Sequence, residues 1–157
     1  MCRKDNDVIV LPHLLYKIPR IDALTSLNKK LADDSSTTGG YLGDFLKERG
    51  VHILLQVVNN RIQSASTTAK LQFKTFDIAI LYECMQICKL IISRSNGIEQ
   101  LMAVSDSITT IAKCLNFQCK VLSLIILDLL TTCSNYSIQF ATAVYKGIQV
   151  TNDFRSV

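Results

Sequence analysis

The sequence predicts an all-α fold, and two observations lead to that prediction. The chain has 157 residues, of which 48% are hydrophobic and 19% charged, with only two prolines and six glycines. This composition argues against disorder and against a turn-rich β-sandwich. Apolar residues also recur at spacings of three and four, the period of an amphipathic helix. The length suits one domain with a sizeable core.

The first predicted helix follows a boundary at Pro19. The short apolar segment Val8 to Ile18 ends there, because proline cannot continue a preceding helix. Pro19 can then help to start a helix whose apolar stripe is Ile21, Leu24, Leu27 and Leu31. The turn formers from Asp33 to Gly40 should end this helix.

Three further helices are predicted in the middle of the chain. A short helix spans Tyr41 to Leu46 and stops at Gly50, and a longer apolar helix runs from Val51 to about Ile62. The polar residues Gln63 to Thr68 predict an exposed loop. A long helix from about Phe76 to Ser93 carries apolar residues on more than one face, so it should be central and buried.

The remaining helices follow Gly97, where asparagine and glycine can close one helix and open another. Ile98 to Met102 forms the next short helix. Ser105-Asp106-Ser107 offers N-cap chemistry for a helix that continues to Leu115, and Asn116-Phe117 marks a turn. A second strongly buried helix spans Gln118 to Cys133. A last helix from Ser137 to Lys146 should end at Gly147, with Thr151 to Val157 frayed.

A loose repeat favours a solenoid over a closed bundle. Gly50-Val51-His52-Ile53-Leu54-Leu55 reappears as Gly97-Ile98-Glu99-Gln100-Leu101-Met102, a spacing typical of armadillo repeats. Each such repeat has an apolar face that only a neighbour can cover. We therefore expect an armadillo-like, right-handed α-solenoid of stacked helical repeats over residues 20–147, with an N-terminal extension at 1–19 and a frayed tail at 148–157.

The apolar runs do not predict a membrane protein. The stretches Ile78 to Ile92 and Val121 to Leu130 both fall short of the roughly 18 uninterrupted apolar residues that a spanning helix needs. The N-terminus lacks a signal-peptide pattern, and neither end carries a lipidation motif. We expect a cytoplasmic protein.

Cysteine usage agrees with a reducing compartment. The six cysteines lack the close pairing of a secreted disulfide scaffold, so most should be reduced and buried. Cys84 and Cys88 share a helix face and make half of a metal site in principle. His13 and His52 are the only histidines, so zinc is the weaker alternative and we expect no cofactor.

Neither an enzyme nor a nucleic-acid-binding protein is predicted. The sequence offers isolated carboxylates, two distant histidines and no nucleophile motif. The net charge of +4 comes from scattered lysines and arginines rather than from a basic run interleaved with aromatic residues. A mildly basic face suits an acidic protein partner, and an ordinary solvated surface explains it equally well.

Several blocks resemble the N-terminal regulatory region of diaphanous-related formins, a GTPase-binding/FH3 armadillo-repeat domain. Leu27-Asn28-Lys29-Lys30-Leu31 is similar to the end of that family's first repeat helix, and Leu46-Lys47-Glu48-Arg49-Gly50-Val51 to its glycine corner. Tyr82 to Lys89, followed by Asn96-Gly97-Ile98, resembles its Glu-Cys-x-x-x-Leu-Lys helix. Leu127 to Cys133 resembles its Leu-Glu-Leu-Leu-x-x-x-Cys helix, with the cysteine one place early. The resemblance covers Ile21 to Lys146.

The resemblance implies an autoinhibitory and GTPase-binding function linked indirectly to actin assembly, at the cytoskeleton. It implies a groove for the formin's own C-terminal autoregulatory helix and a corner that touches a Rho-family small GTPase. By position, the groove residues are Lys89, Ser93, Thr132, Asn135 and Tyr136, and the GTPase corner is Ala32, Asp33 and Asp34. Lys89 would pair with an acidic tail residue, and Thr132 stands where the family has a small residue.

Each of these residues also has a purely structural interpretation. Lys89 can be solvated, Thr132 can bond within its own helix, Tyr136 can pack, and the corner can be an ordinary helix end. An unrelated α-solenoid adaptor or scaffold would share every feature derived from composition and periodicity. The chain also has too few residues before Ile21 for the family's separate GTPase-binding subdomain.

Overall fold

The chain folds into helices throughout the part that the structure, a computed structural model, describes: residues 20–33, 40–66, 73–94, 96–115 and 119–156. Within these ranges there are eight helices and no strand, which confirms the all-α class. The helices are α2 (Ile21–Ala32), α3 (Tyr41–Lys47), α4 (Gly50–Ala65), α5 (Thr75–Ile92), α6 (Gly97–Met102), α7 (Ser107–Lys113), α8 (Lys120–Tyr136) and α9 (Ile138–Ser156).

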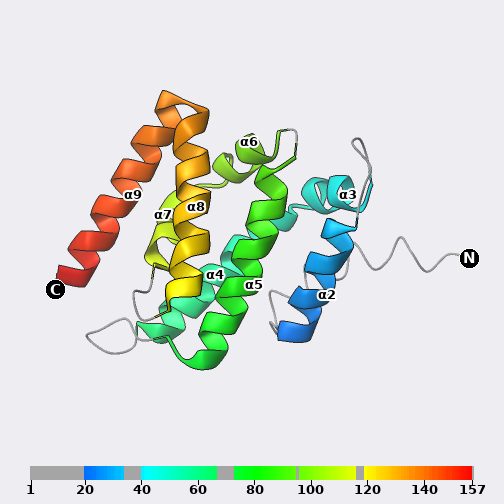
Figure 1. Cartoon of the computed structure of the whole chain (residues 1–157), viewed down its shortest axis with the longest axis horizontal. Coiled ribbons are helices and arrows are strands. Elements are labelled where there is room, and N and C mark those ends of the chain that lie inside the picture. The colour runs from blue at the N-terminus through cyan, green and yellow to red at the C-terminus, as the bar shows by residue number, and fades with distance from the viewer. Residues whose placement is uncertain (1–19, 34–39, 67–72, 95, 116–118, 157) are drawn as a thin grey trace, which may run out of the picture.

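Three of the longer helices lie side by side. Figure 1 shows α2, α5 and α8 in that order, running in the same direction, with α9 returning beside α8. Behind them, α4 packs against α5 and α7, and α7 also packs against α9. The helices therefore form two layers with the apolar core between them.

Helix α5 is the centre of the core. It packs against α2, α4, α6 and α8, and its buried residues include Ile80, Leu81, Met85, Ile87 and Ile91, all fully inaccessible to solvent. Covering a helix on several sides requires apolar residues around its whole circumference, which is the pattern that the sequence has here. The predicted burial of this helix is confirmed.

The predicted all-round burial of α8 is wrong. One side of α8 packs into the core through Leu122, Ile126 and Leu129. The opposite side stays open, because no element in the described part of the chain covers it. Its apolar residues are taken up below.

Polar contacts join neighbouring helices, both within one layer and between the two. The Asp77 carboxylate, which is 7% exposed, accepts the backbone N–H of Lys74 at 3.1 Å and lies 3.5 Å from the Arg61 guanidinium of α4. Asn28 of α2 donates to the Glu83 carboxylate of α5 at 3.2 Å. Such contacts satisfy groups that burial would otherwise leave unpaired.

Two predicted helix ends are wrong. Helix α4 runs on through Gln63 to Ala65, where the polar sequence predicted a loop, because Ala65 is buried and packing outweighs local polarity. Thr67 and Thr68, the rest of that predicted loop, lie outside the described residues. Helix α9 continues through Gly147 to Ser156, so residues 151–156, predicted to be frayed, are helical.

Gly147 is a packing residue rather than a helix terminator. It is buried, and a Cβ atom there would lie 3.3 Å from the Cγ2 atom of Ile108 and 3.4 Å from the Cα atom of Thr109. The missing side chain lets α9 approach α7 closely. The prediction that the helix ends at Gly147 is therefore wrong, because this glycine serves close packing between helices and not a helix C-cap.

The predicted helix starts at residues 97 and 107 are confirmed, with one difference in chemistry. Asn96 adopts a left-handed conformation with a φ of 61° ahead of α6, as its residue type allows. Asp106 is also left-handed, with a φ of 59°, and makes no side-chain cap bond to α7. The expected N-cap bond is therefore absent at Asp106. The extension 1–19 and the turn at Asn116-Phe117 lie outside the described residues.

Candidate functional site

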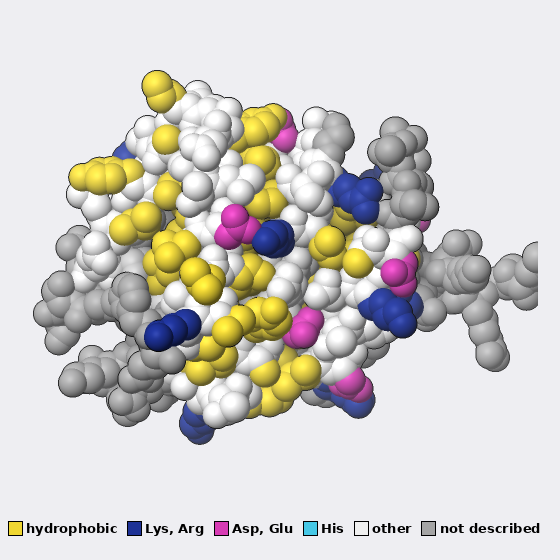
Figure 2. All heavy atoms as spheres, viewed as in Figure 1, with side chains coloured by type: hydrophobic (Ala, Val, Ile, Leu, Met, Phe, Trp, Pro, Cys, Tyr) yellow, Lys and Arg dark blue, Asp and Glu magenta, His cyan; other side chains and the backbone are white. Residues whose placement is uncertain are grey.

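The open side of α8 carries an apolar strip. Val121, Leu124 and Leu127, here called the α8 strip, are 60%, 68% and 45% exposed. Their spacing places them on neighbouring turns of one helix. Figure 2 shows hydrophobic side chains gathered over α8 and the adjoining parts of α5 and α9. Contiguous exposed apolar surface of this kind commonly marks an interaction site.

An ion pair joins α8 to α5 at the end of the strip. The Lys89 Nζ atom lies 2.6 Å from the Asp128 Oδ2 atom, and each side chain is 53% exposed. Lys89, expected to be open to an acidic partner residue, therefore already has a partner within the chain. At this exposure the pair contributes about 0–1 kcal/mol to stability.

Ser93 and Thr132 are exposed and bonded to their own helices. The Ser93 hydroxyl donates to the Leu90 carbonyl at 2.7 Å. The Thr132 hydroxyl donates to the Asp128 carbonyl at 2.9 Å, which matches the structural interpretation of this residue. Thr132 lies one turn beyond Asp128 of the ion pair and is exposed.

Asn135 and Tyr136 lie at the far end of α8. Both are exposed, and the Tyr136 hydroxyl donates a short hydrogen bond to the Glu99 carboxylate of α6. This bond lowers the pKa of Glu99 and raises the pKa of Tyr136. The Tyr136 ring also stacks on Phe140, with 5.3 Å between ring centroids. Tyr136 thus has a packing role that ties α8 to α6 and α9.

The five predicted groove residues lie on one pair of adjacent helices. Lys89 and Ser93 come from the second half of α5, and the other three from the second half of α8, so they lie beyond the α8 strip. We call the strip and these five residues together the α5–α8 surface.

Sequence reasoning did not assign Val121, Leu124 or Leu127 to a site. The sequence did contain one indication of this strip: α8 has more apolar residues than one buried face requires. Such an excess predicts either burial on every side or an open apolar face. Only the neighbouring helices decide between these two outcomes.

The predicted GTPase corner lies partly outside the described residues. Ala32 and Asp33 are exposed at the end of α2, and the Asp33 backbone N–H bonds to the Lys29 carbonyl at 2.9 Å. Asp34 lies outside the described residues.

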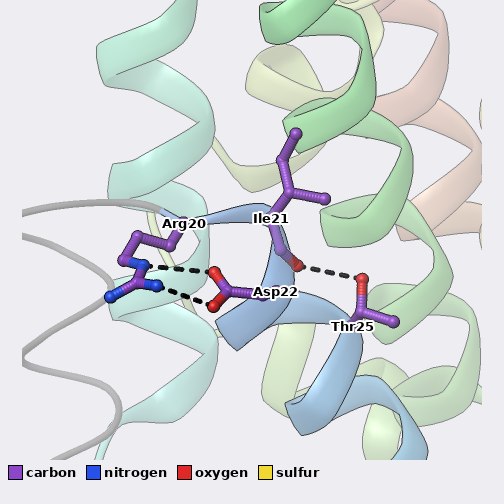
Figure 3. Close-up of polar contacts among 4 residues, drawn as sticks. All are labelled: Arg20, Ile21, Asp22 and Thr25. Carbon is purple, nitrogen blue, oxygen red and sulfur yellow. Dashed lines mark hydrogen bonds and ion pairs between the residues drawn. The ribbon is translucent and has the colours of Figure 1, made fainter.

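An open hollow of about 980 Å³ lies at the start of α2. Figure 3 shows its polar edge, where the Arg20 guanidinium donates to both carboxylate oxygens of Asp22 at 3.2 and 2.8 Å. Thr25 donates to the Ile21 carbonyl at 2.9 Å. Phe76 of α5, which is 48% exposed, supplies the apolar edge. Arg20 and Asp22 satisfy each other, which leaves Lys29 as the remaining charged residue of the lining.

Buried thiols do not make a metal site in the described part of the chain. Cys84, Cys88, Cys114 and Cys133 are buried, which confirms the expected burial, and Cys119 is half-buried. Burial raises the pKa of Cys88 to about 12 and that of Cys133 to about 11, so these thiols are protonated at neutral pH. No group of three or more potential ligands gathers among the described residues. Cys2 lies outside them.

Comparison with protein-family models, with curated proteins and with solved structures gave no match. Of the helices that the structure describes, none combines the length and the apolar character needed to cross a bilayer. What the chain does must therefore be argued from its own surfaces.

Proposed function

We propose that this chain is a protein-interaction module whose α5–α8 surface receives an amphipathic helix of a partner protein. The observation that carries the proposal is the α8 strip, three exposed apolar residues on successive turns of one helix. Fully burying one such side chain stabilises a complex by about 1.5–3 kcal/mol. A partner helix with apolar residues at spacings of three and four would match this strip.

We further propose that the helices form an armadillo-like, right-handed α-solenoid. Helix lengths support it at two of three positions: α3 and α6 have 7 and 6 residues and α5 and α8 have 18 and 17, whereas α7 with 7 residues is shorter than α4 with 16. Equivalent members also pack on each other, α4 on α7 and α5 on α8. In a solenoid, each repeat covers the apolar face of its neighbour in this way.

The specific form of the proposal follows the resemblance to diaphanous-related formins. The partner helix is then a formin C-terminal autoregulatory helix, and an active Rho-family GTPase competes for the module through the corner at Ala32, Asp33 and Asp34. The protein would act in the cytoplasm at the actin cytoskeleton, as a regulator rather than as an enzyme. The alternative, an unrelated solenoid adaptor, would use the same strip without nucleotide dependence.

The direct test measures binding of a fluorescent formin tail peptide to Thr132→Asp and Thr142→Asp proteins. Thr132 and Thr142 are both exposed, and each donates its hydroxyl to the carbonyl four residues earlier at 2.9 Å. The two substitutions therefore change the same local contact, on α8 and α9 respectively. Binding should weaken at least tenfold in Thr132→Asp, about 1.4 kcal/mol, and stay within twofold in Thr142→Asp.

Each result has a defined meaning. No binding of the peptide to the wild-type chain sinks the formin version. Equal binding to both variants shows that the register of the groove is wrong. If the peptide binds and GTP-loaded Rho-family protein does not displace it while the corner is intact, the adaptor alternative gains over formin regulation.

A further inference from the structure

A second hollow, of about 480 Å³, lies between α4 and α7. We call it the α4–α7 hollow. Helices α4 and α7 form two of its sides, and Val150 of α9 closes the third. Its apolar floor includes Val104 and Leu55, and Leu55 is 4% exposed. A hollow of this size with an apolar floor and a polar rim falls within the range of ligand sites. It is separate from the α5–α8 surface, which α5 and α8 form.

The rim of the hollow consists of two matched rows of polar side chains. Helix α4 contributes His52, Gln56 and Asn59, at spacings of four and three. Helix α7 and its N-cap residue contribute Asp106, Thr109, Thr110 and Lys113. Residues at these spacings share one face of a helix. Because α4 packs against α7, the two polar faces line the same hollow.

These polar groups are available to a ligand. His52, Gln56, Thr109 and Lys113 are only half-exposed, and in the described part of the chain none of their side chains makes a hydrogen bond or ion pair. Partial removal of polar groups from water without a partner costs free energy, which a bound ligand would recover.

The hydroxyl groups of Thr109 and Thr110 lack the bond to their own helix that four other helical threonines of the described part make, and Thr131 of α8 lacks it too. Elsewhere, side chains at Thr25, Thr132, Thr142 and Thr151 each donate to the carbonyl four residues earlier at 2.9 Å. Within the described residues, Thr109 and Thr110 make no such bond. Their hydroxyl groups are therefore free to donate to a molecule in the hollow.

The chemistry of the rim fits an extended peptide. The Gln56 and Asn59 carboxamides each offer donors and an acceptor, as a peptide backbone does. Asp106 and Lys113 stand seven residues apart on the same row, about 10 Å along the helix. A peptide in the polyproline II conformation has three residues per turn and rises about 3.1 Å per residue, so opposite charges three residues apart lie on one side of it and about 9 Å from each other, close to this distance.

We propose that the α4–α7 hollow binds a peptide segment in the extended polyproline II conformation, in which a basic and an acidic residue stand three positions apart. The basic residue lies over Asp106 and the acidic residue over Lys113. Gln56 and Asn59 bind the backbone between them, and a small apolar side chain rests on Leu55 and Val104. The site is distinct from the helix-binding surface and does not depend on it.

The experiment titrates the full chain with three acetylated, amidated hexapeptides and follows backbone amide shifts by NMR. Two peptides contain Lys-Ala-Ser-Glu or its reverse, Glu-Ala-Ser-Lys, and the third contains Gln-Ala-Ser-Gln. One of the charged peptides should bind at millimolar concentration, at least threefold more tightly than the neutral one, with shifts confined to α4, α7 and the middle of α9.

Substitutions then assign the contacts. Lys113→Gln and Asp106→Asn should each remove the preference for the charged peptide, and asparagine tolerates the left-handed backbone at residue 106. Gln56→Ala should weaken binding of all three peptides. Gln63→Ala, an exposed glutamine of the same helix outside the hollow, should change nothing. Thr132→Asp should also leave peptide binding intact.

Two results would overturn the proposal. One is the absence of shifts along the hollow with every peptide. The other is binding that Gln56→Ala and Lys113→Gln leave unchanged, because it would place the peptide elsewhere.

Discussion

Substituting Gly97 with alanine should destabilise the protein by about 3 kcal/mol, against the usual direction of this change. Inside a helix, glycine to alanine normally stabilises by about 0.5–1 kcal/mol. At Gly97, however, the new Cβ atom would lie 1.7 Å from the carbonyl oxygen of Ile91 and 2.6 Å from its carbonyl carbon. Both of those atoms belong to the backbone, so no side-chain rotation relieves the clash.

The size of this destabilisation follows from how far the start of α6 must move away from the end of α5. Cβ atoms do not approach other heavy atoms within 3.0 Å, so the contact must widen by at least 1.3 Å, from 1.7 to 3.0 Å. The Ile91 carbonyl also accepts the Arg94 N–H at 3.1 Å in the last turn of α5. Moving α6 away would loosen Leu101, which is fully buried. Overpacking of this kind costs about 1–3 kcal/mol, and partial loss of the α6 contacts adds to it.

Gly43→Ala is the matched control. Gly43 lies within α3, and a Cβ atom there would meet nothing within 4 Å. This variant should therefore gain the usual helix propensity, about 0.5–1 kcal/mol. The pair separates the effect of close packing from that of backbone freedom.

Urea denaturation and thermal unfolding, both followed by far-UV circular dichroism, measure the free energy of unfolding and the Tm of both variants. For a chain of this length, about 3 kcal/mol corresponds to a fall of roughly 6–12 °C in Tm. Gly43→Ala should unfold at slightly higher urea than wild type. If Gly97→Ala were as stable as wild type, the close contact between the end of α5 and the start of α6 would be wrong.

Three other predictions concern exposure, titration and a buried charge. Leu124→Glu should change the free energy of unfolding by less than about 0.5 kcal/mol, because the side chain is already exposed. The same substitution should weaken binding of the fluorescent formin tail peptide, measured by fluorescence anisotropy. The pKa of Cys88, raised by burial to about 12, makes the folded state bind its proton more tightly than the unfolded state does. The contribution of Cys88 to the free energy of unfolding should therefore be constant below about pH 8.5 and fall as the pH rises from there toward about 12. Urea titrations at several pH values measure this, and a free energy of unfolding that does not fall between about pH 8.5 and pH 10 would contradict the burial of this thiol. Asp77→Ala should lower the free energy of unfolding, measured by urea denaturation, by about 1–3 kcal/mol. The substitution removes the acceptor of the Lys74 N–H and leaves Arg61 half-buried without its partner. An unchanged free energy of unfolding would mean that solvent satisfies both groups.

The helices were predictable where the signal is local. Periodic apolar residues gave α2 and α5 within one or two residues of their observed bounds, and Gly97 marked a helix start because Asn96 tolerates the left-handed conformation. The predicted helix ends were wrong where contacts with residues distant in the sequence outweighed the local sequence pattern. Gly147 has the sequence of a helix end, but its contact with Ile108 makes it part of a continuous helix.

The candidate site shows the same division. The resemblance selected five residues that share one pair of helices, but the sequence did not reveal that Lys89 pairs with Asp128. It also left open whether the surplus apolar residues of α8 are covered. Pairing and burial depend on residues far apart in the chain, so they require the packed structure.

The sequence by itself determined the all-α class and the order of the helices, because helix formation depends on residues three and four positions apart and on local breakers such as Pro19. Only the tertiary structure decided which faces remain open. The arrangement of α5 and α9 beside α8 left the α8 strip exposed, and the contact of α4 with α7 brought two polar rows to one hollow. The physical reason is that solvent exposure belongs to the assembled helices and not to any one of them.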